Sequence, residues 1–531
     1  MTRLVRTWAS TCIILLAMVC GIAPSASAQI WSHVYPSTSG VSSANDIPVG
    51  VAMGEKTALV CGTRVINNGS TLKFFQVVAH DVSTGSVVDS LTWPDPINAT
   101  TDSVATAMTS FSSGNYVAVI LTGTTVDYST HRRPTTIMVD NGGTGGALRL
   151  VWSKIEDYAE IDIEVVPVGV SAYISGNPAG ITHVGIASLA GSNGAFVNVY
   201  AGSNGAHAMP LQVLGSVVPI GVAMVTTSHS VGVIMGGTSP YDGADAVTLW
   251  GYQVNAPGGG GPASGDVLGG SLYRVVRNSG DVDTAKAMTT DGAHVAITGH
   301  RVNGSSQNWV TDVVNAYDDN SGTDNIVETW AAPEELDQSG RLDMPTAIVF
   351  YGVSPAEGEE TVPGAVRIGV AGTTKATTSG AATDVLVAGY YLVSSGSYLE
   401  WSKQQNTRLS GYSGNESPAA IAFAAVGAEI DERLFITGTT EKLVNSVVNK
   451  DMLGMCFDAR TEAIVLGADR HLWTNAYFRS GDDNEDVGIG VIAGQALISS
   501  QYDDVLYMTG TTYNATYAKD WYDLRVEPIQ P

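Results

Sequence analysis

Residues 433–440 read RLFITGTT, and this arrangement of a β-rich run, a small residue, a glycine and usually a threonine recurs along the chain. Its eight copies are ALVCGTR at 58–64, AVILTGTT at 118–125, SAYISGN at 171–177, GVIMGGTS at 232–239, HVAITGHR at 294–301, RIGVAGTT at 367–374, RLFITGTT at 433–440 and VLYMTGTT at 505–512. Their glycines, from Gly62 to Gly510, lie 53 to 73 residues apart. Self-similarity at such a period predicts an array of equivalent supersecondary units.

Three further β-rich segments accompany each glycine segment. A strand of small residues precedes it, as in PVGVAM (48–53) and PIGVAM (219–224), and a third strand follows it, as in DVLVAGYYL (384–392). A fourth strand often carries a tryptophan: Trp93, Trp152, Trp330, Trp401 or Trp473. Four strands per unit of this length are typical of one β-propeller blade.

The two ends of the chain predict how the array closes. The last unit stops after its third strand, WYDLRV at 521–526, and the segment IWSHVY at 30–35 supplies a fourth-strand tryptophan, Trp31. Closure of the ring by this segment would remove free sheet edges. We therefore predict an all-β protein with a single eight-bladed β-propeller, seven blades being the alternative. The expected blades are roughly 46–93, 102–152, 162–200, 216–273, 283–330, 343–401, 416–473, and 486–526 plus 30–35.

The first 28 residues have the pattern of a secretory signal peptide. Arg3 and Arg6 precede an apolar run of about 15 residues, shorter than a membrane-spanning helix requires, and small residues up to Ala28 mark a cleavage site. The expected mature protein (29–531) is secreted or periplasmic and has no transmembrane anchor. The formal charge of −25 for the whole chain argues against nucleic acid as a partner. Cys61 and Cys456, in different blades, are expected to be separate buried thiols.

The segment from Thr383 to Thr440, with TDVLVAGYYLVSSGSYLEW, ESPAAIAF and RLFITGTT, resembles the SBBP family of bacterial β-propeller repeats. The resemblance extends loosely over the whole expected mature chain. It implies a propeller fold and an extracellular setting, but no particular reaction. Those repeats were named from seven-bladed predictions, whereas eight units are counted in this chain.

An acidic residue precedes the small-residue strand in seven units. These acids are Asp46, Asp102, Asp162, Asp283, Asp343, Glu416 and Asp486. In a propeller they would gather at one mouth of the central channel. They could form a carboxylate ring that holds a cation such as Ca²⁺, or each could fix a turn by accepting backbone hydrogen bonds. Their repetition favours the structural role, and no cofactor is firmly implied.

Other acidic residues admit the same two interpretations. A second aspartate precedes the third strand in five units: Asp245, Asp312, Asp384, Asp451 and Asp520. The segment DDNSGTD (318–324) resembles part of a calcium-binding loop but lacks the full alternation of acids. Turn-fixing roles are favoured for all of them.

The loops that follow the repeat glycines vary most and should share a face with the acids. Binding residues commonly lie on loops that a rigid scaffold holds. The candidate ligand-binding residues there are Tyr128, His131, Arg132, Tyr241, Trp309, Tyr513 and Tyr517, with Arg133 and Lys442 nearby. Packing of these aromatic side chains across neighbouring loops is the alternative.

The common catalytic motifs of hydrolases, metalloproteases and nucleotide-binding enzymes are not found in the sequence. The leading hypothesis is an exported, non-enzymatic binding or scaffold protein that presents propeller loops to a protein or glycan. One alternative is a polysaccharide hydrolase or lyase with channel-mouth carboxylates, which would require paired acids about 5 to 10 Å apart. A structural component of the cell envelope or matrix is the other.

Overall fold

In this computed structural model the described part of the chain lies between Gln29 and Val526. It leaves out residues 36–45, 68–70, 95–100, 127–131, 144–146, 158–163, 176–179, 192–193, 227–230, 242–243, 255–272, 276–281, 319–323, 329–333, 337–340, 352–365, 376–381, 394–395, 406–411, 427–430, 445–446, 460–470, 478–484, 499–500 and 514–518. The predicted signal peptide, 1–28, and residues 527–531 also fall outside it. Within the described residues, no helix is long and apolar enough to cross a membrane.

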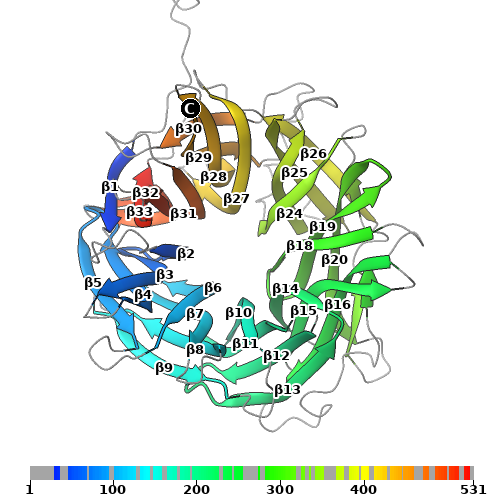
Figure 1. The fold of residues 1–531 in the computed structure, drawn as a ribbon, viewed down its shortest axis with the longest axis horizontal. Helices are drawn as coiled ribbons and strands as arrows, with labels where there is room; N and C mark the ends of the chain where they lie inside the picture. Colours follow the sequence, from blue (N-terminus) through cyan, green and yellow to red (C-terminus); the bar gives the residue numbers. More distant parts are fainter. Residues whose placement is uncertain are drawn as a thin grey trace, which may run out of the picture.

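Eight antiparallel sheets, which we name blades 1 to 8 in chain order, form a ring around a central axis (Figure 1). Blade 1 contains β2 (Ile47–Met53), β3 (Thr57–Asn67), β4 (Thr71–Asp81) and β5 (Val87–Trp93). Blade 2 contains β6 (Ser103–Ser113), β7 (Tyr116–Val126), β8 (Arg132–Asp140) and β9 (Arg149–Ile155). Blade 3 contains β10 (Val165–Ser175), β11 (Gly180–Ala190), β12 (Gly194–Ala201) and β13 (His207–Gly215). Blade 4 contains β14 (Val218–Thr226), β15 (Val231–Tyr241), β16 (Ala244–Val254) and β17 (Tyr273–Val275).

The second half of the ring repeats this order. Blade 5 contains β18 (Val282–Thr290), β19 (His294–Asn303), β20 (Ser306–Asp318) and β21 (Asp324–Glu328), with β22 (Glu334–Leu336) also paired to β20. Blade 6 contains β23 (Met344–Tyr351), β24 (Val366–Lys375), β25 (Thr383–Val393) and β26 (Gly396–Gln405). Blade 7 contains β27 (Tyr412–Val426), β28 (Asp431–Val444), β29 (Val447–Asp458) and β30 (His471–Tyr477). Blade 8 contains β31 (Asp486–Ile498), β32 (Gln501–Tyr513), β33 (Lys519–Val526) and β1 (Gln29–Tyr35).

The pairing of β1 with β33 closes the ring, as predicted (Figure 1). The two strands run antiparallel, with Trp31 opposite Arg525 and Tyr35 opposite Trp521. The eight-bladed prediction is therefore confirmed, and the seven-bladed alternative is not.

Blade 3 departs from the expected repeat register. Its SAYIS segment belongs to the inner strand β10, not to the second strand, and Gly176 lies outside the described residues. Ser188 of β11 takes the place of the repeat glycine, because it pairs with Pro167 as Gly237 pairs with Pro219 in blade 4. The fourth strand, β13, lies beyond residue 200, at which the sequence places the end of this blade.

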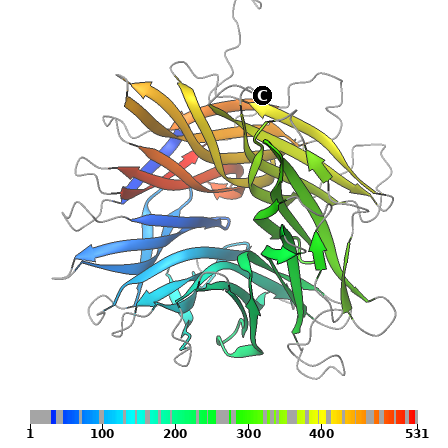
Figure 2. The same ribbon diagram turned by 45° about the vertical axis from the view of Figure 1, so that its right-hand side comes forward.

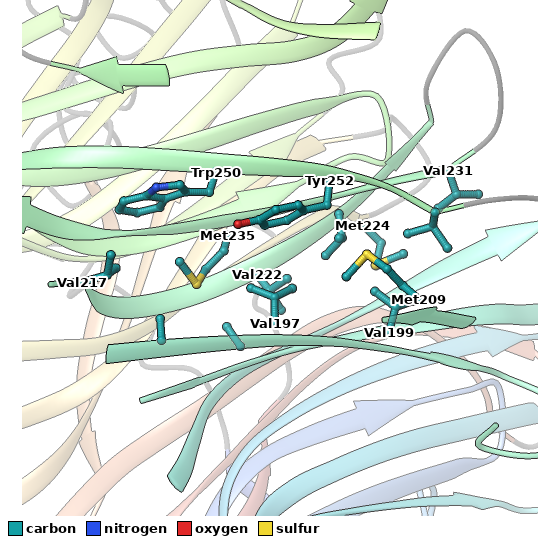
Figure 3. Close-up of a cluster of buried hydrophobic side chains, with 14 residues drawn as sticks. Val197, Val199, Met209, Val217, Val222, Met224, Val231, Met235, Trp250 and Tyr252 are labelled. Carbon is teal, nitrogen blue, oxygen red and sulfur yellow. The ribbon is translucent and has the colours of Figure 1, made fainter. Parts of the chain in front are cut away.

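The hydrophobic core is divided into layers between neighbouring blades, whose sheets face one another around the axis (Figure 2). The layer between blades 3 and 4 includes Val197 and Met209 from one sheet and Val222, Met235 and Trp250 from the other (Figure 3). Cys61 and Cys456 lie in different layers as separate buried thiols. Because each sheet is covered on both faces, burial of its apolar residues stabilises the ring as one unit.

A β-bulge at one position of every blade explains the repeat glycine. The first strand of each blade skips one residue in its pairing with the second strand, as between Pro48 and Gly50. The skipped residues are Val49, Thr106, Val168, Ile220, Lys286, Thr346, Ala419 and Ile489. Beside the bulge, a Cβ on Gly123 would lie against the Val104 carbonyl oxygen and 2.8 Å from the Ala105 Cα. Close backbone approach therefore requires glycine at this position in blade 2, whereas blade 3 accommodates Ser188 beside the equivalent bulge.

Candidate functional site

The first strand of each blade is the inner strand, and it contacts the inner strands of both neighbouring blades. We name the face at which these eight strands begin the front face. The third strand of a four-stranded antiparallel sheet runs in the same direction as the first, so it also begins at the front face. The predicted acids and ligand-binding residues that the structure describes at these strand ends therefore belong to one face of the ring.

Five predicted acids occupy the same position of the repeat. This position lies two residues before the inner-strand residue that pairs with the repeat glycine, or with Ser188 in blade 3. The five acids are Asp46, Asp283, Asp343, Glu416 and Asp486, and their exposed fractions are 0 to 2%. They belong to the consecutive blades 5, 6, 7, 8 and 1. The same position holds Ser103, Val165 and Val217 in blades 2, 3 and 4. The predicted carboxylate ring is therefore an arc, and its side chains are buried.

Two of the predicted acids lie elsewhere. Asp102 precedes Ser103, is half-buried, and accepts a 2.9 Å hydrogen bond from the backbone N–H of Lys73 in blade 1. It therefore fixes a contact between blades 1 and 2 rather than a turn within its own blade. Asp162 lies outside the described residues. The exposed acid that precedes β10 is Glu164, which the sequence analysis does not single out.

Asp46 has an unusual electrostatic environment. Its Oδ1 accepts a 2.6 Å hydrogen bond from the Val65 N–H, while Oδ2 has no hydrogen-bond partner among the described residues and lies 3.9 Å from the Arg64 Nε. Burial raises the pKa of Asp46 to about 7, and the nearby charge of Asp520 in blade 8 acts in the same direction. The Val65 hydrogen bond and the Arg64 charge oppose this rise in pKa.

Asp283 in blade 5 is paired with a buried guanidinium. Arg301 donates from Nε to Oδ1 at 2.9 Å and from Nη2 to Oδ2 at 2.8 Å. Its Nη1 also contacts Glu335 of the additional strand β22 at 3.3 Å, and Asn308 donates to the same carboxylate at 2.6 Å. This network joins three strands of blade 5 to β22. Planar bidentate pairing of this kind holds side chains in place.

The second set of aspartates is also largely buried. Asp312, Asp384, Asp451 and Asp520 are 0 to 7% exposed, whereas Asp245 is exposed. In blades 6, 7 and 8, the third-strand aspartate pairs with a threonine of the second strand, as Asp520 does with Thr512. In blades 7 and 8 that threonine also pairs with the inner-strand acid, so two acids share one row of the sheet.

The structure separates the predicted ligand-binding residues. Arg132 begins β8 on the front face, is more than half exposed, and forms a 3.1 Å ion pair with Glu164 at the start of blade 3. Arg133 pairs with Asp157. Tyr241 and Tyr513 end β15 and β32, whereas Tyr128, His131 and Tyr517 lie outside the described residues. Lys450 forms a comparable ion pair with Glu485 at 3.5 Å between blades 7 and 8.

Trp309 is not a loop residue, contrary to the prediction. Its side chain is fully buried in the layer between blades 5 and 6, with Leu336 and Ile368. It lies in β20 because the third strand of this blade begins earlier than the sequence pattern indicates. A ligand at the surface therefore cannot contact this indole.

Lys286 was missed by the sequence analysis, although the segment DTAKAM was recognised as an inner strand. It is the bulged residue of blade 5 and is exposed. Across the eight inner strands with the bounds given above, it is the one Lys or Arg. The signal was a charged residue at a position where the other blades have uncharged residues.

His300 lies beside Lys286 and is 7% exposed. Its pKa is lowered by burial and, to a smaller extent, by the positive charge of Lys286. Its Nδ1 has no hydrogen-bond partner among the described residues. The imidazole is therefore neutral at physiological pH, and one ring nitrogen is available for a further hydrogen bond.

The described acids do not form a metal-binding cluster. Among the residues that the structure describes, no three or more His, Cys, Asp or Glu side chains are arranged to hold a metal ion. Asp318 and Asp324 are paired at the ends of β20 and β21, and the segment between them lies outside the description.

By its strand topology the chain is an eight-bladed β-propeller. No family model matches it, and no curated protein matches it. Among solved structures it is similar to Sqt1 from Chaetomium thermophilum, with 10% identity, 91% of this chain and 97% of that chain covered, and a TM-score of 0.43. It is also similar to the Nup133 β-propeller domain of Vanderwaltozyma polyspora (8% identity, 78% and 99% covered, TM-score 0.33). A third similarity is to a subtype N11 neuraminidase-like protein of A/flat-faced bat/Peru/033/2010 (H18N11) (11% identity, 78% and 85% covered, TM-score 0.29).

Proposed function

We propose that this chain is an exported, non-catalytic scaffold that binds a protein partner through the front face of its propeller. The observation that carries the proposal is the burial of Asp46, Asp283, Asp343, Glu416 and Asp486. Acids that contact a polysaccharide must be reachable by it, and these five are enclosed between strands and blades. The recurring carboxylates therefore favour a structural role over hydrolysis.

Export is proposed from the amino-terminal sequence, with its basic residues, apolar run and small residues before Gln29. The exposed ion pairs Arg132–Glu164 and Lys450–Glu485 support the front face as the binding surface. They hold charged groups at blade junctions on a rigid scaffold, where partner binding does not require ordering of the surface.

Site-specific photocrosslinking would test this proposal. A crosslinking amino acid at Arg132 or Lys450 should capture the same protein from the envelope or culture fluid of the source organism. The same group at Val88 or Leu150, exposed on the outer strands β5 and β9 at the ends away from the front face, is the matched control and should not capture it. Equal capture from both sets would contradict the proposed face. Glycan-array binding without protein capture would instead support a carbohydrate partner, and turnover of a polysaccharide would support the hydrolase alternative.

A further inference from the structure

The inner strands expose an ordered set of side chains toward the central axis. Neighbouring blades cover both faces of each sheet, so an exposed inner-strand side chain reaches solvent at the axis. The position after the acid position holds Ile47, Val104, Val166, Val218, Met344 and Val487 in six blades, and we name these six residues the collar. Ile47, Val218 and Met344 are 38 to 44% exposed. The collar is an apolar surface near the front face, interrupted by Thr284 in blade 5 and Ser417 in blade 7.

A single positive charge lies further along the axis. Lys286 is two residues beyond Thr284, which holds the collar position in blade 5, so it is about 7 Å deeper at the usual rise per residue. Two other bulged side chains are already bonded, since Thr106 donates to the Pro167 carbonyl and Thr346 to that of Pro418. Lys286 forms no ion pair with any residue that the structure describes. Its ammonium therefore has no counter-charge among the described residues.

His300 adds a second unused polar group at the same place. At its position in blades 1 and 4, Thr63 and Thr238 accept hydrogen bonds from the N–H groups of the next inner strand. In blade 6, the inner-strand residue equivalent to these N–H donors is Pro345, which has no N–H to donate to His300. The missing donor explains why the His300 Nδ1 has no partner among the described residues. A polar group that is buried and unsatisfied is costly unless a ligand satisfies it.

The backbone of the inner strands supplies the remaining polar groups. Each inner strand is the end strand of its sheet, and edge strands present backbone N–H and C=O groups that can pair with another chain. A peptide can use such groups, whereas the hydrocarbon chain of a fatty acid cannot. The axial surface therefore combines apolar side chains, peptide groups and one cation.

We propose that this axial surface binds the C-terminal end of a partner polypeptide. The last apolar side chains would contact the collar, and the α-carboxylate would pair with the Lys286 ammonium and accept a hydrogen bond from the Nδ1–H of His300, in the neutral tautomer that carries its proton there. This inference rests on the proposed binding function and specifies which part of the partner is recognised. An anionic end is selected because Lys286 is the one charged residue that the inner strands expose toward the axis among the residues described.

Binding of defined peptide pools tests the proposal. Fluorescent hexapeptides with random apolar residues at the last three positions would be compared as free acids and as C-terminal amides on the full mature protein. The free-acid pool should be retained and the amide pool should bind about tenfold more weakly or worse, because a charge-assisted contact is lost. Lys286→Met should weaken free-acid binding by a similar factor, and Lys286→Arg should preserve it.

Two controls separate this result from general charge effects and from misfolding. Val88→Met alters an exposed residue of the outer strand β5 without changing charge, and Lys73→Met removes one positive charge from the third strand of blade 1, away from the axis. Both variants should bind the free-acid pool as the unsubstituted protein does. Equal binding of acid and amide, no binding of either pool, or preferential binding of palmitate would overturn the proposal. Capture of a partner by Arg132 crosslinking, with no peptide binding, would leave the scaffold function standing and reject only the axial site.

Discussion

The indole Nε1 of Trp521 donates a 3.2 Å hydrogen bond to the carbonyl oxygen of Thr63, although 458 residues separate them. This contact joins the third strand of blade 8 to the second strand of blade 1. The indole is 1% exposed and packs in the layer that includes Val60 and Tyr507. The ring is therefore sealed in two ways, by backbone pairing of β1 with β33 and by a side chain that reaches the first blade.

Replacement of this side chain should weaken the seam. Trp521→Ala removes a large buried ring and its hydrogen bond, and a substitution of this kind costs about 3 to 5 kcal/mol. The free energy of unfolding in urea, followed by circular dichroism, would measure the loss. Trp93→Ala is the matched control, since Trp93 is only half-buried on the outer strand β5, and it should cost clearly less. Equal losses would argue against a special role for the seam.

The steric explanation of the repeat glycine can be tested in blade 2. Gly123→Ala places a methyl group against the Val104 carbonyl and should destabilise the protein by about 1 to 3 kcal/mol, as overpacking does. Gly215→Ala is the control, because a Cβ there meets nothing within 4 Å. Its effect should stay within about 0.5 kcal/mol. Thermal unfolding of both variants beside the parent protein would decide, and a neutral Gly123 substitution would refute the explanation.

The pKa of about 7 for Asp46 predicts a pH-dependent contribution to stability. Because the folded state holds this proton more tightly than the unfolded state, the native protein is favoured while the carboxyl is protonated. That advantage decreases as pH rises from about 4 through 7, by at most about 1.4 kcal/mol per pH unit.

Asp46→Asn should remove this dependence while keeping the acceptor for the Val65 N–H. Urea unfolding at intervals between pH 4 and pH 8 would measure it, with the parent-minus-variant difference isolating Asp46 from other titrating groups. Parallel pH profiles for the two proteins would show that Asp46 titrates normally.

The Asp283–Arg301 pair should be strongly coupled. Arg301→Met leaves a buried carboxylate without its partner, which typically costs about 3 to 5 kcal/mol. The double variant Asp283→Leu with Arg301→Met should recover much of that loss, because no uncompensated charge remains. A double-mutant cycle in urea measures the coupling energy. Lys450→Met, at an ion pair in which both side chains are more than a third exposed, should cost about 1 kcal/mol or less.

The sequence was informative wherever a local steric or hydrogen-bonding requirement recurs. The glycine beside each bulge and the small residues of the inner strand are needed in almost every blade, so the number of units and the closing segment at Trp31 could be predicted. The prediction was wrong where another residue type occupies the position of the repeat glycine. Ser188 replaces the glycine in blade 3, so the similar segment ending at Gly176 was aligned in its place.

The roles of the candidate-site residues were harder to predict from the sequence. Whether Asp283 is a ligand or a structural residue depends on Arg301, 18 residues away on another strand. Trp309 was assigned to a loop because the start of its strand depends on pairing with β19 and β22, which the local pattern does not record. Lys286 was overlooked because its significance depends on the uncharged residues at the same position in seven other blades.

The sequence alone determined that this is a closed array of eight four-stranded units, since backbone geometry repeats and leaves a repeating residue pattern. Only the tertiary structure decided which charges are enclosed and which reach solvent. That distinction depends on the packing of each blade against the next, and it places Asp46 in the interior and Lys286 on the axial surface.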